Sequence, residues 1–407
     1  MSSTRPARPP AAAAWSRAGL LDELLAPISR QAFFADCWEQ KPAVTRGRAS
    51  DFFQPLFSLA DVDRFICYHK PEPGHIDLVC DAGFVRDNFL NADHTANVDL
   101  VYESYLKGST VVLSGLEDTW EPLVFFSRAL ERDLNHPVAV AVYLTPPGVH
   151  GVQPHFDTQE NLILQVEGSK RWRVYPPARD LPPVEGSYVP VPRASLPAPL
   201  LDTEVCPGDV LYVPRGFAHE AHAGDQGSLH ITVDIHVRTW LDLLSDALAL
   251  VGERHRELRR ALPVGLLQED ALPADLERQL ADHLARLRDV SLDEVLRKYT
   301  EALVVRKPPP PDGRFAIRDT AVALDTWVAR RATTLTRLVR EPGVAGLQFS
   351  GNQLMGPEKI AGALAFIAAH DAFTPAMLPG PLHDREKLVL VRRLVRIGLL
   401  TLREPTR

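Results

Sequence analysis

The sequence predicts an α+β protein in which a β-sandwich or small barrel of jelly-roll type is followed by helices. Short apolar stretches bounded by Gly or Pro follow one another after Pro137, with no helical spacing between them. From Trp240 the apolar residues recur at helical spacing instead. The proline run at 307–313 predicts a semi-rigid linker, and we expect a last domain at 314–407.

The first expected domain covers residues 19–238. Amphipathic patterns predict helices at Leu20–Leu25, at Ala60–Tyr68 and within Trp120–Leu134. Five strands are then expected, at Val138–Leu144, Leu162–Val166, Lys170–Tyr175, Asp209–Val213 and Leu229–Val237. Because Gly168 lies in a short polar break between the second strand and the third, these two are expected to form a hairpin.

Three amphipathic helices are expected within 239–306, at Trp240–Leu250, Pro273–Leu287 and Ser291–Val304. Ser291 followed by Glu294 is typical of a capping box, in which each side chain bonds the backbone of the other residue. After the linker we expect two helices, a turn at Leu378-Pro379-Gly380, a helix at Arg385–Ile397 and a short strand at Leu399–Leu402.

The composition excludes several classes of protein. The 407 residues carry a net charge of −7 and an isoelectric point near 6.1, so no basic field favours nucleic acid. No apolar run approaches the length of a membrane span. The 4 cysteines form no CxxC pair, which favours a reducing, cytoplasmic setting. Residues 1–18 are expected to be a disordered leader, with a transit peptide as the alternative.

The chemistry is expected around His155 and Asp157. One residue separates them, in the segment between two predicted strands, so on extended backbone both side chains project from one face. His219, which closely follows the strand Asp209–Val213, is the natural third ligand. Two histidines and one carboxylate make a facial triad, whose open positions suit Fe(II), a bidentate co-substrate and dioxygen. The rival ligands are His222, as the second choice, His230 and His236.

Lys170 shares one face of its expected strand with Trp172. A lysine pointing into the barrel would be costly to bury without an acidic ligand; the alternative is a solvated lysine in a hairpin arm. In Ser228–Val237, apolar and polar residues alternate, and the polar face includes Thr232 and Asp234. That face contacts solvent or, in an enzyme, lines the pocket.

Two stretches resemble the JmjC-type cupin-like oxygenases and, among them, the ribosomal oxygenases. They are TPPGVHGVQPHFDTQENLILQVEGSKRWRVYPP and PGDVLYVPRGFAHEAHAGDQGSLHITVDIH. The resemblance is specific over Val111–Trp240 and looser toward the C-terminus. It implies a double-stranded β-helix (the cupin/JmjC jelly roll) at 19–238, a helical dimerisation region at 239–306 and a C-terminal winged-helix domain at 314–407.

The resemblance also implies an enzyme, a dioxygenase that uses Fe(II), 2-oxoglutarate and O2 to hydroxylate a protein side chain. His155, Asp157 and His219 would bind the iron. Lys170 would pair with the distal carboxylate of 2-oxoglutarate, which would neutralise the buried ammonium. Tyr143 would hydrogen-bond near that carboxylate or near the substrate.

The remaining pocket wall departs from the family pattern. Ala141 stands where many members carry Asn, and Asp234 stands where a small hydroxyl residue is common. Thr232 is expected beside the co-substrate. The small Ala141 leaves room for a flat or long polar side chain, and Asp234 could accept from an imidazole or a guanidinium. We therefore expect hydroxylation at Cβ of a His or Arg side chain, in a ribosomal protein.

Two other functions stay open at this point. One is a 2-oxoglutarate-dependent tailoring hydroxylase of a ribosomally made peptide, and the other is a non-catalytic cupin that binds a ligand or DNA. The C-terminal segment has only a slight basic excess, so we expect its winged helix to contact protein rather than nucleic acid. The helices of 239–306 carry broad apolar stripes, and the resemblance implies a homodimer built there.

Overall fold

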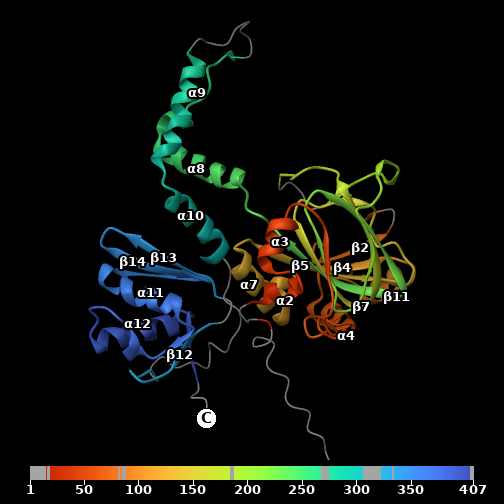
Figure 1. The fold of residues 1–407 in the computed structure, drawn as a ribbon, viewed down its shortest axis with the longest axis horizontal. Coiled ribbons are helices and arrows are strands. Elements are labelled where there is room, and N and C mark those ends of the chain that lie inside the picture. The colour runs from red at the N-terminus through yellow and green to blue at the C-terminus, as the bar shows by residue number, and fades with distance from the viewer. Residues whose placement is uncertain are drawn as a thin grey trace, which may run out of the picture. The chain divides into compact units, whose positions relative to one another are not determined.

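The computed structural model describes Trp15 and residues 19–80, 83–84, 89–183, 188–266, 275–305, 322–331 and 334–403. The chain divides into two compact units, Met1–Val237 and Arg238–Arg407 (Figure 1). Apart from Trp15, the leader expected at 1–18 lies outside the described residues, and so does the linker expected at 307–313.

An antiparallel sheet forms the centre of the first unit, which confirms the mixed α and β class. The strand order is β1-β10-β7-β11-β5-β4-β2-β3; β6 joins β11 to β8, and β9 pairs with β7. The strands are β1 (Ala43–Thr45), β2 (Ile76–Cys80), β3 (Gly83–Phe84), β4 (Thr110–Ser114), β5 (Val138–Thr145), β6 (His155–Phe156), β7 (Glu160–Pro177), β8 (Val189–Pro190), β9 (Leu201–Val205), β10 (Val210–Val213) and β11 (Phe217–Ile235).

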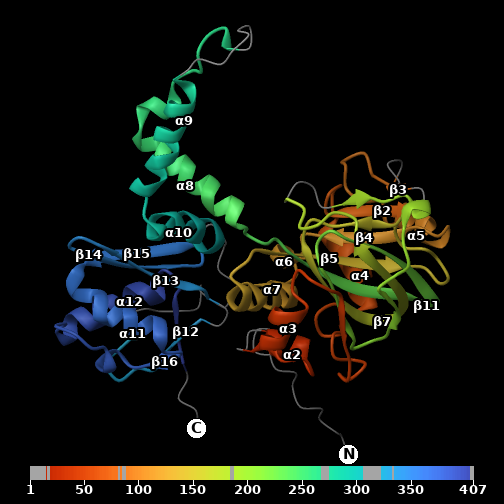
Figure 2. The ribbon, with the colours of Figure 1, turned by 45° about the horizontal axis from the view of Figure 1, so that its top comes forward.

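Helices cover part of this sheet, and α2, α3 and α7 lie together beside β5 (Figures 1 and 2). The helices are α2 (Leu20–Leu25), α3 (Arg30–Asp36), α4 (Leu59–Arg64) with a π-helical turn (Phe65–His69), α5 (Val98–Leu106), α6 (Leu116–Thr119) and α7 (Glu121–Leu134), and a 3₁₀ turn lies at Arg193–Ser195. α7 has a proline in its first turn, where the missing N–H is not needed. Its apolar side chains Leu123, Phe126 and Leu130 are fully buried.

The expected hairpin around Gly168 is wrong, because both predicted strands belong to the single strand β7. β7 pairs with β11, and the register shifts between Ala223 and Ser228. Gly168 has φ +62°, and a β-carbon added to it would lie 2.1 Å from the carbonyl oxygen of Gly227. The glycine therefore lets two strands approach closely at a bulge. A turn signal in the sequence does not distinguish this use from a hairpin turn.

β11 separates the core from the cavity. Its apolar row is at most 1% exposed and belongs to the main hydrophobic core: Leu229, Ile231, Val233 and Ile235. The alternate residues His230, Thr232 and Asp234 line a cavity inside the sheet, so the polar face does not simply contact solvent. β11 begins at Phe217, well before the expected start at Leu229, so His219 and His222 both lie within this strand.

The second unit begins with the three helices expected in 239–306. They are α8 (Trp240–Arg254), α9 (Leu276–Ala285) and α10 (Leu292–Thr300), with 3₁₀ turns at Arg256–Arg259 and Arg286–Asp289 and a π-helical turn at Glu301–Val305. The capping box is confirmed: Ser291 Oγ accepts from the backbone N–H of Glu294, whose carboxylate accepts from the backbone N–H of Ser291. Pro273, the expected start of the second helix, lies outside the described residues.

Strands replace the first of the two helices expected before Leu378. A three-stranded sheet has the order β13-β14-β15, and another has the order β16-β12-β17. The turn between β13 and β14 contains Pro342 and Gly343, the latter with φ +76°, and this pair is a turn signal in the sequence. The elements are β12 (Val328–Arg330), β13 (Thr336–Glu341), β14 (Val344–Phe349), β15 (Asn352–Pro357), α11 (Ala361–Ala369), β16 (Ala372–Phe373), α12 (Asp384–Arg396) and β17 (Leu400–Leu402), with 3₁₀ turns at Glu358–Ile360 and Pro375–Met377.

The last helix and strand are confirmed at almost the expected bounds, as α12 and β17. α11 contacts β13 and β14, and α12 contacts β17. Among the residues that the structure describes, no helix has the length and apolar character needed to cross a membrane.

Candidate metal and co-substrate site

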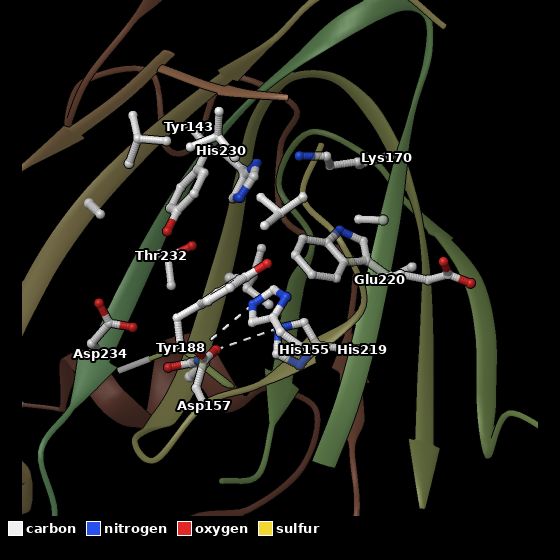
Figure 3. Close-up of a pocket in the computed structure, with 18 of the residues that line it drawn as sticks. Tyr143, His155, Asp157, Lys170, Tyr188, His219, Glu220, His230, Thr232 and Asp234 are labelled. Atoms are coloured by element: carbon white, nitrogen blue, oxygen red, sulfur yellow. Dashed lines mark hydrogen bonds and ion pairs between the residues drawn. The ribbon is translucent and has the colours of Figure 1, made fainter. Parts of the chain in front are cut away.

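A cavity of about 240 Å³ lies inside the curled sheet of the first unit (Figure 3). Its walls include side chains from β2, β4, β5, β7 and β11. It brings together every site residue expected from the sequence: His155, Asp157, His219, Lys170, Tyr143, Thr232, Asp234 and Ala141.

His155, Asp157 and His219 form a compact group whose ligand atoms all lie within 4.8 Å of one another. The two carboxylate oxygens of Asp157 lie 3.7 Å from His155 Nε2 and 3.5 Å from His219 Nε2. Strand pairing produces this geometry, because His155 on β6 and His219 on β11 are direct register partners. Asp157 directly follows β6. Two imidazoles and one carboxylate that converge on one position are the ligand set of a first-row transition metal such as Fe(II).

Backbone carbonyls orient both imidazoles. His155 Nδ1 lies 2.8 Å from the carbonyl oxygen of Gln153, and His219 Nδ1 lies 3.1 Å from that of Phe217. Because a carbonyl only accepts, each Nδ1 carries the proton and each Nε2 presents its lone pair toward Asp157. The three ligands are therefore oriented for a metal by the fold itself.

The protonation of the group also favours a cation. Burial, and secondly the neighbouring His219, hold the pKa of His155 well below its ordinary value, so its imidazole is neutral near pH 7. Burial raises the pKa of Asp157, while Asn161 Nδ2 donates to its carboxylate at 2.5 Å. A metal ion placed among these groups would restore the charge of the buried carboxylate.

Lys170 is 2% exposed and lines the same cavity, which contradicts the alternative of a solvated lysine in a hairpin arm. Its ammonium donates a hydrogen bond to Thr145 Oγ1 at 3.0 Å and lies 5.7 Å from the centre of the Trp172 ring. Burial lowers the pKa of Lys170 to about 7. A ligand carboxylate at this place would restore the ammonium's full charge.

The opposite end of the cavity is acidic. Burial raises the pKa of Tyr143, and the carboxylates of Asp234, Asp157 and Asp77 raise it further. Burial, together with the neighbouring acids Asp157 and Glu117, raises the pKa of Asp234 to about 8. The cavity thus has a basic group, Lys170, at one end and acidic side chains at the other.

The hydroxyl of Tyr143 points toward Thr232 and Asp234 and away from Lys170 (Figure 3). Ala141 is the register partner of Thr232 on the neighbouring strand. Whether Tyr143 contacts the co-substrate or the substrate stays a prediction, and so does a contact between Thr232 and a co-substrate.

The rival histidines do not join the metal group. His230 lines the cavity but lies outside the compact cluster. His222 lines a separate surface hollow with His150, and its ring lies 4.6 Å from that of His150. His236 is not among the residues that line either space.

Several residues of the site could not be found from the sequence. Asp77 and Tyr188 line the cavity from segments far from the motifs, and Asn161 lies four residues after Asp157. Thr145 on β5 accepts a hydrogen bond from Lys170 on β7, and a β-carbon added to Gly151 would lie 2.8 Å from Lys170 Nζ. Nothing in the sequence around a single tyrosine or glycine indicates that it lines a cavity, because this depends on how the strands pair.

Comparisons with known proteins agree with this geometry. The model of the JmjC domain family matches residues 121–243. Rat ribosomal oxygenase 2 is 32% identical over 285 residues, which are 67% of this chain and 60% of the rat protein. The histidyl-hydroxylase NO66 of Drosophila persimilis, also named a lysine-specific demethylase, is 32% identical over 61% of this chain and 37% of its own length. The chain thus spans 60% or less of these two relatives.

Solved structures of a bacterial protein share the fold. YcfD from Escherichia coli aligns with a TM-score of 0.55 at 20% identity, covering 92% of this chain and 98% of YcfD. YcfD, described as a ribosomal oxygenase, has also been solved with cobalt and 2-oxoglutarate, and that structure aligns with a TM-score of 0.52 at 19% identity, again over 92% of this chain and 98% of YcfD. Residues 121–243 thus match the JmjC domain, and the chain is similar to curated ribosomal oxygenases over about two thirds of its length.

Proposed function

We propose that this chain is an Fe(II)- and 2-oxoglutarate-dependent dioxygenase that hydroxylates a His or Arg side chain of a ribosomal protein. One observation carries the proposal: a single cavity holds both the His155, Asp157 and His219 group and the buried ammonium of Lys170. The YcfD structure with cobalt and 2-oxoglutarate and the histidyl-hydroxylase name of a relative support it.

Bound iron, with 2-oxoglutarate and dioxygen, would supply the oxidant for an unactivated C–H bond. His155, Asp157 and His219 would hold the metal beside the cavity that they line. The ammonium of Lys170 orients the co-substrate through its distal carboxylate. The buried walls exclude water from the reacting groups.

The acidic end of the cavity would hold the substrate side chain. No hydrogen bond or ion pair of the Asp234 carboxylate occurs within the described part of the chain, so an imidazole N–H or a guanidinium can pair with it. Tyr143 offers a hydroxyl beside it, and Ala141 leaves space. These contacts would present Cβ of the substrate residue to the metal.

Mass spectrometry tests this function. The purified protein with Fe(II), 2-oxoglutarate and O2 should form succinate and add one oxygen to a single His or Arg peptide of the host's ribosomal proteins. Asp157→Ala should abolish both products. Succinate without any modified ribosomal protein, together with a modified small biosynthetic peptide, would favour the tailoring hydroxylase. An absence of succinate with every metal would favour the non-catalytic cupin.

We further propose a homodimer built from 239–306. α8 and α9 expose apolar side chains that are between 48% and 79% accessible: Trp240, Leu241, Leu244, Leu248, Leu280 and Leu284. Along α8 these residues follow helical spacing on one face, as expected for a helix that packs against a partner.

The domain boundaries, the role of the winged helix and the cellular compartment are part of the same proposal. A catalytic jelly roll at 19–238 and a winged helix at 314–407 are supported by the curled sheet and by the three-stranded sheet β16-β12-β17 with α11 and α12. We assign the winged helix to protein contacts and the whole chain to the cytoplasm. The 4 cysteines, none of which forms a disulfide, support the latter.

A further inference from the structure

His230 is a buried imidazole in the cavity that the proposed chemistry has not yet used. It is 2% exposed and lies on β11, where its register partner on β5 is Tyr143. Its ring stacks on the Tyr143 ring at 4.9 Å with an interplanar angle of 5°. The ring also contacts Trp172 edge to face at 5.6 Å. Two aromatic neighbours therefore fix the plane of the imidazole.

The Nδ1 atom of His230 is buried and has no hydrogen-bond partner within the described residues. A buried polar nitrogen without a partner costs free energy, and such atoms are rare in folded proteins. Burial and, secondly, the charge of Lys170 hold the pKa of His230 well below its ordinary value. The ring is thus neutral, with one N–H to donate.

The Lys170 ammonium lies on the same side of the cavity and is directed toward the His230 ring (Figure 3). Two other residues, Thr145 and Gly151, lie close to the ammonium. Thr145 Oγ1 accepts its hydrogen bond at 3.0 Å, and a β-carbon added to Gly151 would lie 2.8 Å from Nζ. Lys170 and His230 both line the cavity, so one ligand there can contact both side chains.

We propose that His230 is a second binding residue for the distal carboxylate of 2-oxoglutarate, donating its Nδ1–H to one oxygen while Lys170 donates to the carboxylate. This inference rests on the proposed function, which places that carboxylate at Lys170. The rigid ring loses no side-chain freedom when the ligand binds. One bound anion would provide both the charge partner of the ammonium and the missing hydrogen-bond partner of the imidazole.

Binding of 2-oxoglutarate to the anaerobic Zn(II)-loaded protein, measured by calorimetry, tests the inference without turnover. His230→Asn places an amide N–H close to the position of Nδ1, whereas His230→Gln places it near that of Nε2. We expect His230→Asn to bind within threefold of the wild type. His230→Gln and His230→Leu should bind at least about tenfold more weakly, as expected for the loss of one hydrogen bond to a charged group.

Oxalate is the matched ligand, because it has two oxygens for the metal and no distal carboxylate. Its affinity should be the same for the wild type and all His230 variants. A Zn(II)-loaded His230→Gln protein that binds 2-oxoglutarate as tightly as His230→Asn would overturn the role of Nδ1, and this comparison stands even if His230→Leu fails to fold. Weaker oxalate binding in these variants would also overturn it, because the defect would then lie at the metal.

Lys170→Ala separates this inference from the function on which it rests. If 2-oxoglutarate binding depends on Lys170 but not on His230, the inference is wrong and the proposed function stands. If the wild-type protein does not bind 2-oxoglutarate, or if Lys170→Ala binds it unchanged, the proposed co-substrate site itself is wrong.

Discussion

His155 on β6 and His219 on β11 are direct cross-strand partners, and their ring centres lie 4.3 Å apart. The two histidines are 64 residues apart in the sequence, and the pairing of β6 with β11 brings them together. Because strand pairing positions both rings, the site should exist before any metal binds.

Removal of a ligand should therefore abolish metal binding without unfolding the protein. We expect Asp157→Ala and His219→Ala to weaken Mn(II) binding at least about 100-fold, since even residues that only orient ligands account for roughly 10–100-fold. His222→Ala should bind Mn(II) normally, because His222 lines a different hollow. Calorimetric titration, with thermal unfolding as the control, measures this. A metal site that survives Asp157→Ala but not His222→Ala would show that the ligands are wrongly assigned.

Lys170 should make 2-oxoglutarate binding depend on pH. Burial lowers the pKa of its ammonium to about 7, and Thr145 and neutral His230 are the polar groups described around it. Below pH 7 the empty site is already charged. Above pH 7 binding must take up a proton, so affinity should fall by up to about tenfold per pH unit.

Calorimetry of the Zn(II)-loaded protein in two buffers of different ionisation enthalpy detects this proton uptake. Lys170→Ala gives the baseline for the pH dependence of the metal ligands. The pKa of Lys170 is about 7 in the folded protein and 10.5 for an unperturbed lysine, so between pH 7 and 10 Lys170 is protonated mainly in the unfolded chain. The free energy of unfolding of the wild type should therefore rise with pH relative to that of Lys170→Met. Equal pH profiles for wild type and variant would contradict both statements.

The sequence predicted the parts of the site where residue type and residue spacing indicate the same strand or ligand group. The alternation after Ser228 predicts both faces of β11, and the motif around His155 predicts a metal group that the structure does bring together. Strand pairing was not predictable in the same way. Gly168 has the same sequence signal in a hairpin and in a bulge, and only its contact with Gly227 distinguishes them. Asp77 has no motif, because the topology alone brings β2 to the cavity.

The bulge at Gly168 should be essential for stability. An added β-carbon would lie 2.1 Å from the carbonyl oxygen of Gly227, at a φ of +62° that disfavours other residues. We expect Gly168→Ala to lower the free energy of unfolding by on the order of 2–3 kcal/mol. Gly74→Ala is the matched control: it also has positive φ, at +92°, but nothing lies within 4 Å. Its loss should be about 1 kcal/mol. Urea unfolding that gave equal losses would show that contact with Gly227 does not matter.

The exposed apolar face of α8 should determine the oligomeric state. Leu244 and Leu248 are 54% and 48% exposed and lie one helical turn apart. Placing glutamate at both positions would put charges into the proposed interface while leaving the buried Val251 untouched. Light scattering should give the mass of two chains for the wild type and of one chain for the double variant. A wild type with the mass of one chain would exclude the homodimer.

Asp234 should distinguish substrate binding from co-substrate chemistry. Its carboxylate lies at the end of the cavity occupied by Tyr143 and Thr232, away from Lys170 (Figure 3). If it pairs with the substrate side chain, Asp234→Ala should lower substrate-coupled turnover at least about tenfold, as expected for a lost hydrogen bond involving a charged group. The slow formation of succinate without substrate should stay unchanged, because the metal ligands and Lys170 are intact. Asp234→Asn, which keeps an acceptor but cannot ionise beside a guanidinium, should favour a His peptide over an Arg peptide relative to the wild type. Peptide mass spectrometry measures the added oxygen, and a succinate assay without peptide measures the uncoupled reaction. A variant that loses both reactions together would place Asp234 with the co-substrate and not with the substrate.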